Sequence, residues 1–300
     1  MYNNFIVALV DGNGKIISSQ PYEEYQYGRR SMDILVPVRG GRLIEILHDD
    51  IGNISYENNR LVLKHIFVSN INVTAMTLLG KIAEAVLVKR CHKNEDLNRK
   101  LFALARRKQA TKKTSHRFHA IGTGLKPTLQ RYPHRYNPSD PQRDIIWVAE
   151  NGHTALMAGS TSMYGVEAGL QVKASLDGIS YVVNDLETNR YEVPMVYFPI
   201  NNDFEKVVDK LIRDKKTFVL NPNTGEYRNI IIGDDIVDIR TYDHDAFEEV
   251  KDYYPIVVAL LKGDIEIADL IEIARGNGTL QNIVLSTAIS VSNADSIICT

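Results

Sequence analysis

The sequence predicts an α/β protein of the α+β kind, with a β-rich N-terminal unit, a core of helices and strands, and a helical C-terminal tail. Three observations lead to this fold class. The chain has 300 residues, of which 44% are apolar and 24% are charged, as in ordinary globular proteins. Turn signals are dense in the first seventy residues, and later apolar residues recur either in short runs or at spacings of three and four. We therefore expect a β-rich unit at 1–73, a core at 74–235 and a helical extension at 236–300.

The N-terminal unit is predicted to consist of strands. A turn signal at 11–14 and a Gly-Gly pair at 40–41 each separate two β-type runs, which indicates two hairpins. The predicted strands are Phe5–Val10, Lys15–Ser19, Asp33–Val38, Arg42–Leu47 and Arg60–Val68.

The remaining elements follow from hydrophobic periodicity. Helices are expected at Thr74–Cys91, Glu95–Lys108, Asp203–Arg213, Ala246–Leu261 and Ile265–Ala274. Strands are expected at Arg143–Ala149, Ala168–Ser175, Ile179–Val183, Val193–Ile200, Thr217–Leu220 and Tyr227–Ile232. Residues 109–141 are rich in Pro, Gly and basic side chains without an apolar period, which predicts a long, mobile, basic loop.

Charge is strongly segregated along the chain. The total is only −2, but the window Lys89–Arg135 holds fourteen Lys and Arg against two acids, a net of +12. The rest of the chain then has 21 basic and 35 acidic residues, a net of −14. A near-neutral total therefore conceals a basic segment that could bind a polyanion.

The chain has two cysteines, Cys91 and Cys299, too few for a disulfide framework or a thiolate zinc site. We therefore expect a reducing, cytoplasmic location. The N-terminus has no basic region before its apolar run. We find no apolar run close to the roughly 18 residues that a membrane helix needs. Neither secretion nor a membrane span is predicted.

Three features in chain order suggest a catalytic site. Glu84 lies on a predicted helix, Asp144 opens an apolar strand, and Gln171-Val172-Lys173 lies in the next well-defined strand. Because side chains alternate along a strand, Gln171 and Lys173 share one face. We expect the two acids to meet that pair at one point.

These residue types suit hydrolysis of a phosphodiester assisted by a divalent cation. Mg²⁺ prefers oxygen ligands and takes one or two carboxylates from a protein, so Asp144 and Glu84 are the expected ligands, joined by the Val172 carbonyl, with Glu167 in reserve. Lys173 would orient or help deprotonate the attacking water and offset phosphate charge, and Gln171 would supply an amide oxygen. Each residue alone has an ordinary structural interpretation as a solvated or ion-paired side chain.

In these motifs the sequence resembles the PD-(D/E)xK nuclease superfamily, in the variant with a QxK strand. The resemblance covers about Thr74 to Ile232. Gly80-Lys81-Ile82-Ala83-Glu84 resembles the helix acid of Holliday-junction resolvases, and Gly169-Leu170-Gln171-Val172-Lys173 resembles the strand of type IV restriction endonucleases. The sequence departs from the family pattern in the long insertion between Glu84 and Asp144 and in the spacing from Asp144 to Gln171.

The resemblance implies a restriction-endonuclease-like fold, in which helices flank a mixed sheet, and an endonuclease that uses Mg²⁺ or Mn²⁺, with catalytic residues Asp144, Gln171, Lys173 and Glu84. It implies nucleic acid, DNA in the first instance, as the partner, and by analogy a role in restriction or phage defence. Cutting of palindromic sites would require two active sites and hence a homodimer.

The basic segment is the predicted nucleic-acid-binding surface, since cationic side chains with interleaved aromatic residues bind phosphates and bases. The predicted contacts are Arg106, Arg107, Lys108, Lys112, Lys113, Arg117, Lys126, Arg131 and Arg135. A solvated, disordered loop that binds nothing explains the same composition equally well. Two other functions remain open: a non-catalytic nucleic-acid-binding or interaction protein on the same scaffold, and an enzyme acting on another phosphoester or a small nucleotide.

Overall fold

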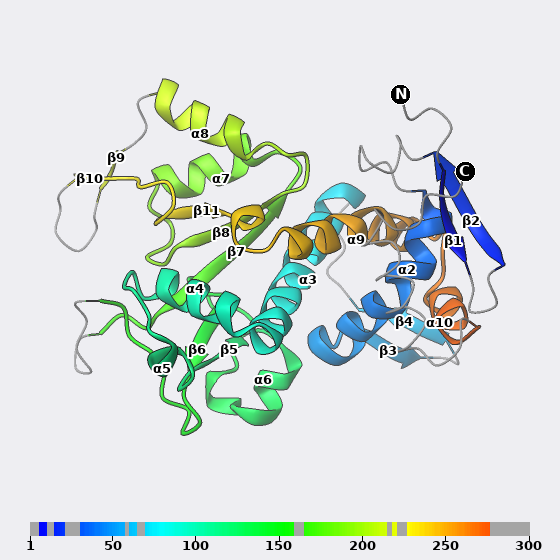
Figure 1. Ribbon diagram of the computed structural model, residues 1–300, viewed down its shortest axis with the longest axis horizontal. Coiled ribbons are helices and arrows are strands. Elements are labelled where there is room, and N and C mark those ends of the chain that lie inside the picture. Colours follow the sequence, from blue (N-terminus) through cyan, green and yellow to red (C-terminus); the bar gives the residue numbers. More distant parts are fainter. Residues whose placement is uncertain are drawn as a thin grey trace. The chain divides into compact units, whose positions relative to one another are not determined.

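The computed structural model describes residues 6–10, 15–21, 31–57, 60–64, 70–158, 165–214, 218–220 and 227–276. The predicted turn at 11–14, the connection 221–225 between two predicted strands, and the end of the Arg60–Val68 strand lie outside these residues. The chain divides into two units (Figure 1). Unit 1 comprises Met1–His48, Gly52–Ala75 and Lys251–Thr300, and unit 2 comprises Asp49–Ile51 and Met76–Val250.

In unit 1, two antiparallel strand pairs accompany two helices that pack on each other. The pairs are β1 (Ile6–Val10) with β2 (Ile16–Pro21), and β3 (Ile54–Glu57) with β4 (Arg60–Leu63). The helices are α2 (Met32–Glu45) and α10 (Ile267–Gly276), which lie in contact. Because α10 packs on α2, the C-terminal helix belongs with the N-terminal unit, a division that differs from the expected boundaries after residues 73 and 235.

Unit 2 is built on a five-stranded mixed sheet in the order β11-β8-β7-β6-β5. The pairs β5·β6 and β6·β7 are antiparallel, whereas β7·β8 and β8·β11 are parallel. The strands are β5 (His119–Gly122), β6 (Ile145–Val148), β7 (Gly169–Ser175), β8 (Met195–Pro199) and β11 (Ile236–Asp238). The mixed α/β class, with helices flanking a mixed sheet, is therefore confirmed.

The other elements complete the described chain. They are the π-helical turn Ile46–Ile51, α3 (Ile71–Lys93), α4 (Glu95–Ala105), α5 (Lys112–Ser115), α6 (Lys126–Arg131), the 3₁₀ turn Pro133–Arg135, α7 (Gly178–Glu187), α8 (Phe204–Arg213), β9 (Phe218–Leu220), β10 (Tyr227–Asn229), the 3₁₀ turn Ile239–Thr241 and α9 (His244–Lys262).

The two faces of the sheet bury different side chains. On one face, the fully buried Trp147 donates from its indole Nε1 to Asn98 of α4 at 2.8 Å. On the other face, Met195 and Tyr197 of β8 form a core with residues of α7 and α8 such as Val182 and Val207. Strand alternation places Val172 on the first face, and Gln171 and Lys173 on the second.

The prediction of a loop at 109–141 is wrong. This stretch contains α5, β5 and α6, and β5 is the edge strand of the central sheet. Ala120 and Ile121 of β5, together with Thr128 and Tyr132, are buried. The elements are only four to six residues long, too short to show an apolar period, so proline and basic residues dominated the pattern.

Three strand predictions, in two places, are also wrong, and in both places the chain is helical. The predicted hairpin at 33–47 lies in α2 and the start of the π-helical turn that follows it. Gly40 allows close helix packing, since a Cβ there would lie 3.1 Å from Leu270 of α10. The predicted strand Ile179–Val183 lies in α7, because Asp177 caps that helix by accepting a hydrogen bond from the Ser180 amide. β11 was not predicted at all.

Within the described residues, one helix, α3, is long and apolar enough to cross a membrane by length and composition, contrary to the sequence expectation. The apolar composition of α3 is explained by its burial in the core, since 61% of its most apolar window lies inside the structure. Leu78, Leu79 and Ile82, for example, are fully buried. Such a helix is weak evidence for a membrane span, because core helices pass the same test.

Gly169→Ala is expected to lower the free energy of unfolding by about 2–3 kcal/mol. A Cβ at Gly169 would lie 2.8 Å from the Arg143 side chain and 2.9 Å from the Ile145 carbonyl oxygen, which belongs to the paired strand. Urea denaturation measures the effect. Gly80→Ala in α3, where a Cβ meets nothing within 4 Å, is the matched control and should gain about 0.5–1 kcal/mol. Equal stability of the two variants would contradict the prediction.

Candidate functional site

Asp144 joins the start of β6 to the middle of β7. Its amide donates to the Leu170 carbonyl at 2.9 Å, and its carboxylate Oδ2 accepts from the Val172 amide at 2.7 Å. The Thr123 amide in turn donates to the Asp144 carbonyl at 2.8 Å. The side chain is therefore fixed where β6 and β7 separate.

Glu84 approaches the same corner from α3. It is 6% exposed, and its Oε1 has no hydrogen-bond partner among the described residues. A Cβ at Gly122 would lie only 2.4 Å from this oxygen, so glycine at the end of β5 makes the close approach possible. A buried carboxylate oxygen without a partner is costly, which marks this position as a site that a cation or a proton would complete.

The two carboxyl groups influence each other. Burial raises the pKa of Glu84 well above its usual value, and the nearby charge of Asp144 raises it further. Burial also raises the pKa of Asp144 to about 6, against the opposing effects of the Val172 amide and of Lys173. The structure thus brings the two predicted acids together in a position where both ionised forms are disfavoured without a cation.

The Val172 carbonyl points toward the same corner. In a strand, the N–H and C=O of one residue point to the same side, and the Val172 N–H points at Asp144. The neighbouring Gln171 amide points the other way, to the Pro194 carbonyl beside β8, at 2.9 Å. The third predicted oxygen ligand is therefore directed to the side of β7 where Asp144 lies.

Lys173 is turned toward α7 and the segment that follows it. It is 7% exposed, and its ammonium donates to the hydroxyls of Tyr191 at 2.7 Å and Tyr181 at 3.0 Å. Asp185 Oδ2 lies 3.4 Å from Lys173 Nζ. Burial by itself lowers the pKa of Lys173, but the hydroxyl hydrogen bonds outweigh it and the pKa is raised. The side chain is therefore charged, so its predicted role in deprotonating water does not suit this arrangement.

The four predicted catalytic residues do not all share one face of the sheet. Gly122 pairs with Ile145 on the face of Val172, so Glu84 approaches from that face, opposite to Gln171 and Lys173. Asp144 links the two sets, since its pKa responds to Lys173 and its charge acts on Glu84. The buried Gln171 Oε1 also lacks a partner among the described residues.

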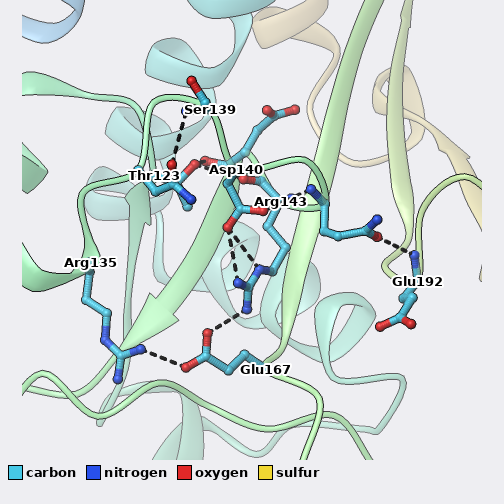
Figure 2. Close-up of polar contacts among 10 residues, drawn as sticks. Thr123, Arg135, Ser139, Asp140, Arg143, Glu167 and Glu192 are labelled. Atoms are coloured by element: carbon cyan, nitrogen blue, oxygen red, sulfur yellow. Dashed lines mark hydrogen bonds and ion pairs between the residues drawn. The ribbon is translucent and has the colours of Figure 1, made fainter.

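Glu167, the reserve ligand, is held by two arginines (Figure 2). Its carboxylate accepts from Arg135 at 2.7 Å and from Arg143 at 2.5 Å, and Arg143 also pairs with Asp140 at 3.1 Å. Burial raises the pKa of Glu167, but the arginines outweigh it and the pKa is lowered. Glu167 precedes β7 and pairs with Leu156 in an isolated bridge. These contacts assign it to a structural ion-pair network.

The nine predicted nucleic-acid contacts differ in their exposure and in their partners. Arg106 donates to the Leu156 carbonyl, Arg107 pairs with the buried Asp235 at 2.7 Å, and Arg135 pairs with Glu167, so these three are engaged in the fold. Lys126 is partly exposed. Arg107 is also exposed, although it is ion-paired; the other exposed members, which we call the basic surface set, are Lys108, Lys112, Lys113, Arg117 and Arg131.

Four residues of the site were not predicted from the sequence. Lys81 is exposed on α3, and its charge lowers the pKa of both Glu84 and Asp144. Its spacing of three residues from Glu84 on a helix was an available signal. Tyr181, Asp185 and Tyr191 could not be found in this way, because Tyr181 was placed in the predicted strand Ile179–Val183 and the other two lie between predicted strands.

The described residues contain no cluster of three or more His, Cys, Asp or Glu side chains that could hold a metal ion. The donor set at the corner is smaller: two carboxylates and one carbonyl, which is compatible with Mg²⁺ retaining several waters. No family model, curated protein or solved structure matches the chain. Any functional assignment therefore depends on the residues and their geometry.

Proposed function

We propose that the chain is a Mg²⁺-dependent nuclease that hydrolyses phosphodiester bonds of nucleic acid, in the manner of PD-(D/E)xK enzymes with a QxK strand. The observation that carries the proposal is the pair of buried carboxylates at the β6–β7 corner, Glu84 and Asp144, with Glu84 Oε1 unpartnered. The order α3, β5, β6, β7, α7, β8 supports a restriction-endonuclease-like arrangement of the core.

The donor chemistry fits a hard divalent cation. Asp144, Glu84 and the Val172 carbonyl would hold it, and Mn²⁺ suits the same oxygen ligands. When bound, such a cation supplies charge stabilisation at the phosphoryl oxygens and a more acidic water. The protein's part is to keep two carboxylates close together and largely out of water. Without a cation their negative charges would repel each other.

The remaining side chains act as neutral or positive groups beside that pair. The charged Lys173 ammonium offsets negative charge on the scissile phosphate and orients the water that attacks it. Gln171 offers an amide oxygen in the same strand, and it carries no charge that would compete with the carboxylates for a proton.

Nucleic acid is the proposed substrate because the basic surface set lies on α5, on α6 and in the connections on either side of α5, and these segments lead into the strands of the site. If each of the five exposed cations contacts one phosphate, they predict salt-dependent binding, with a slope of log K against log salt of roughly −4.5 for duplex DNA.

A second function is favoured by one observation. Lys173 is enclosed by Tyr181, Tyr191 and Asp185 instead of facing open space, which suits a nucleic-acid-binding protein that retains the scaffold without catalysis. This candidate predicts the same salt dependence of binding, together with no cleavage in any divalent ion and no calorimetric binding of Mg²⁺.

The deciding experiment is incubation of the purified protein with supercoiled plasmid DNA in Mg²⁺, Mn²⁺ or EDTA. We expect nicked or linear product only with a divalent cation, and no product from Lys173→Ala or Asp144→Ala. Circular dichroism and urea unfolding establish that the variants are folded. If both variants cut as well as the parent protein, the assignment is wrong. Plasmid binding without cleavage selects the second function.

A further inference from the structure

The ammonium of Lys173 lies in a set of side chains that we call the lysine clamp: Tyr181, Asp185 and Tyr191. Each tyrosine ring centroid lies 4.7 Å from Nζ, in addition to the hydroxyl hydrogen bonds. Tyr191 and Asp185 are 8% and 2% exposed, whereas Tyr181 is 45% exposed. The ammonium is thus bound by two rings, two hydroxyls and a carboxylate.

Local structure explains how the clamp is assembled. Tyr181 and Asp185 are four residues apart on α7, so they share one face of the helix. α7 ends at Glu187, and Asn189 takes a left-handed backbone (φ 47°), which asparagine tolerates better than most residues. The chain then turns back and brings Tyr191 to the other side of the ammonium.

Asp185 is itself held in place. Arg190 donates to Asp185 Oδ1 at 3.0 Å, and its guanidinium carbon lies 5.3 Å from the Tyr191 ring centroid. The Asp185 carboxylate is therefore shared between Arg190 and Lys173. Its Oδ2 lies 3.4 Å from Lys173 Nζ and makes an ion pair without a hydrogen bond. This leaves the two hydroxyls as the hydrogen-bond acceptors that fix the direction of the ammonium.

We propose that Tyr191 and Tyr181, supported by Asp185, are positioning residues that orient the Lys173 ammonium for phosphodiester hydrolysis. The inference rests on the proposed function. A lysine side chain rotates about four bonds, so it loses much conformational freedom when its ammonium is fixed. Partners that already hold the ammonium in place lower this cost when it acts on a single phosphate. The tyrosines act through Lys173 and need not touch the substrate.

The test compares Y191F, Y181F, the double variant Y181F/Y191F and the control Y227F. Tyr227 is 75% exposed on β10 and outside the clamp, so its variant measures the loss of a hydroxyl elsewhere. We expect Y191F to lower kcat about ten-fold with KM within about two-fold, and the double variant to lower kcat further. Y227F should match the parent protein.

A second readout does not depend on catalysis. In metal-free protein labelled with ¹³C-lysine, ring currents from the two tyrosines should displace the ε-methylene proton signal of Lys173, which is identified by its absence in Lys173→Arg. Because phenylalanine keeps each ring, a move of the signal toward the free-lysine position in Y181F/Y191F reports that the ammonium has left its place between the rings once the hydroxyls are lost. At one fixed pH we expect that move in Y181F/Y191F and none in Y227F. Circular dichroism confirms that the variants are folded.

The two readouts separate the possible failures. If the parent protein cleaves nothing, the proposed function fails, and the NMR signal alone then supports or overturns the clamp. An active parent with an unmoved signal or an unchanged kcat in the double variant overturns the positioning role. A moved signal together with a lower kcat supports it.

Discussion

Asp144→Asn is expected to lower plasmid cleavage by roughly 10³-fold or more, since a lost ligand charge removes several kcal/mol of stabilisation at about 1.4 kcal/mol per factor of ten. The substitution is nearly isosteric. The asparagine oxygen can still accept from the Val172 amide, which now donates to Asp144 Oδ2 at 2.7 Å. The corner therefore keeps its shape and loses one of its two negative charges. Initial cleavage rates in saturating Mg²⁺ measure the effect.

Glu84→Gln should produce a similar loss, because it removes the other carboxylate of the pair. Asp209→Asn is the matched control, since Asp209 is exposed on α8 and contributes to no site. We expect this control to cleave at the parent rate. Cleavage by Asp144→Asn and Glu84→Gln within a factor of two of the parent would remove the basis of the proposed cation site.

The same two carboxylates should make the metal-free protein less stable as the pH rises. The pKa of Asp144 is about 6 in the folded protein, above the ordinary value of 3.8, and that of Glu84 is also raised. A raised folded-state pKa contributes stability that is present below the ordinary pKa and lost as the pH rises through the folded value. For Asp144 the loss is at most about 3 kcal/mol, from about two pKa units at 1.36 kcal/mol each.

Urea unfolding between pH 5 and 8 tests this prediction. Carboxylates with lowered pKa values, such as Asp96 and Glu167, lose their contribution at lower pH and are constant in this window. The free energy of unfolding of the parent should fall with rising pH, and that of Asp144→Asn should fall less. Parallel curves for the two proteins would contradict the predicted role of Asp144.

Addition of Mg²⁺ should reverse the loss at pH 8. A ligand that binds only the folded state stabilises it by about 2.7 kcal/mol at a concentration one hundred times its Kd. We expect this gain in the parent protein and little of it in Asp144→Asn or Glu84→Gln. Equal stabilisation of all three by Mg²⁺ would place the cation elsewhere.

Long apolar patterns were sufficient to predict most of the core. The strands β6, β7 and β8 and the helices α3 and α8 were predicted close to their observed bounds, because each buries a continuous run or stripe of apolar residues. The predictions of short elements failed. α5, β5 and α6 have too few residues for a period, and the β-branched run Ile179–Val183 lies in α7, because capping and packing prevailed over β-propensity.

The sequence by itself determined the charge segregation and the alternation that sends Gln171 and Lys173 to one face of a strand and Val172 to the other. Both are local properties of composition and of the two-residue strand period. Only the tertiary structure decided which side chains meet. Glu84 and Asp144 come together because glycine at position 122 lets α3 approach the sheet edge, and the Lys173 ammonium lies between tyrosines because a helix follows β7. Such contacts join residues distant in sequence, so no local pattern specifies them.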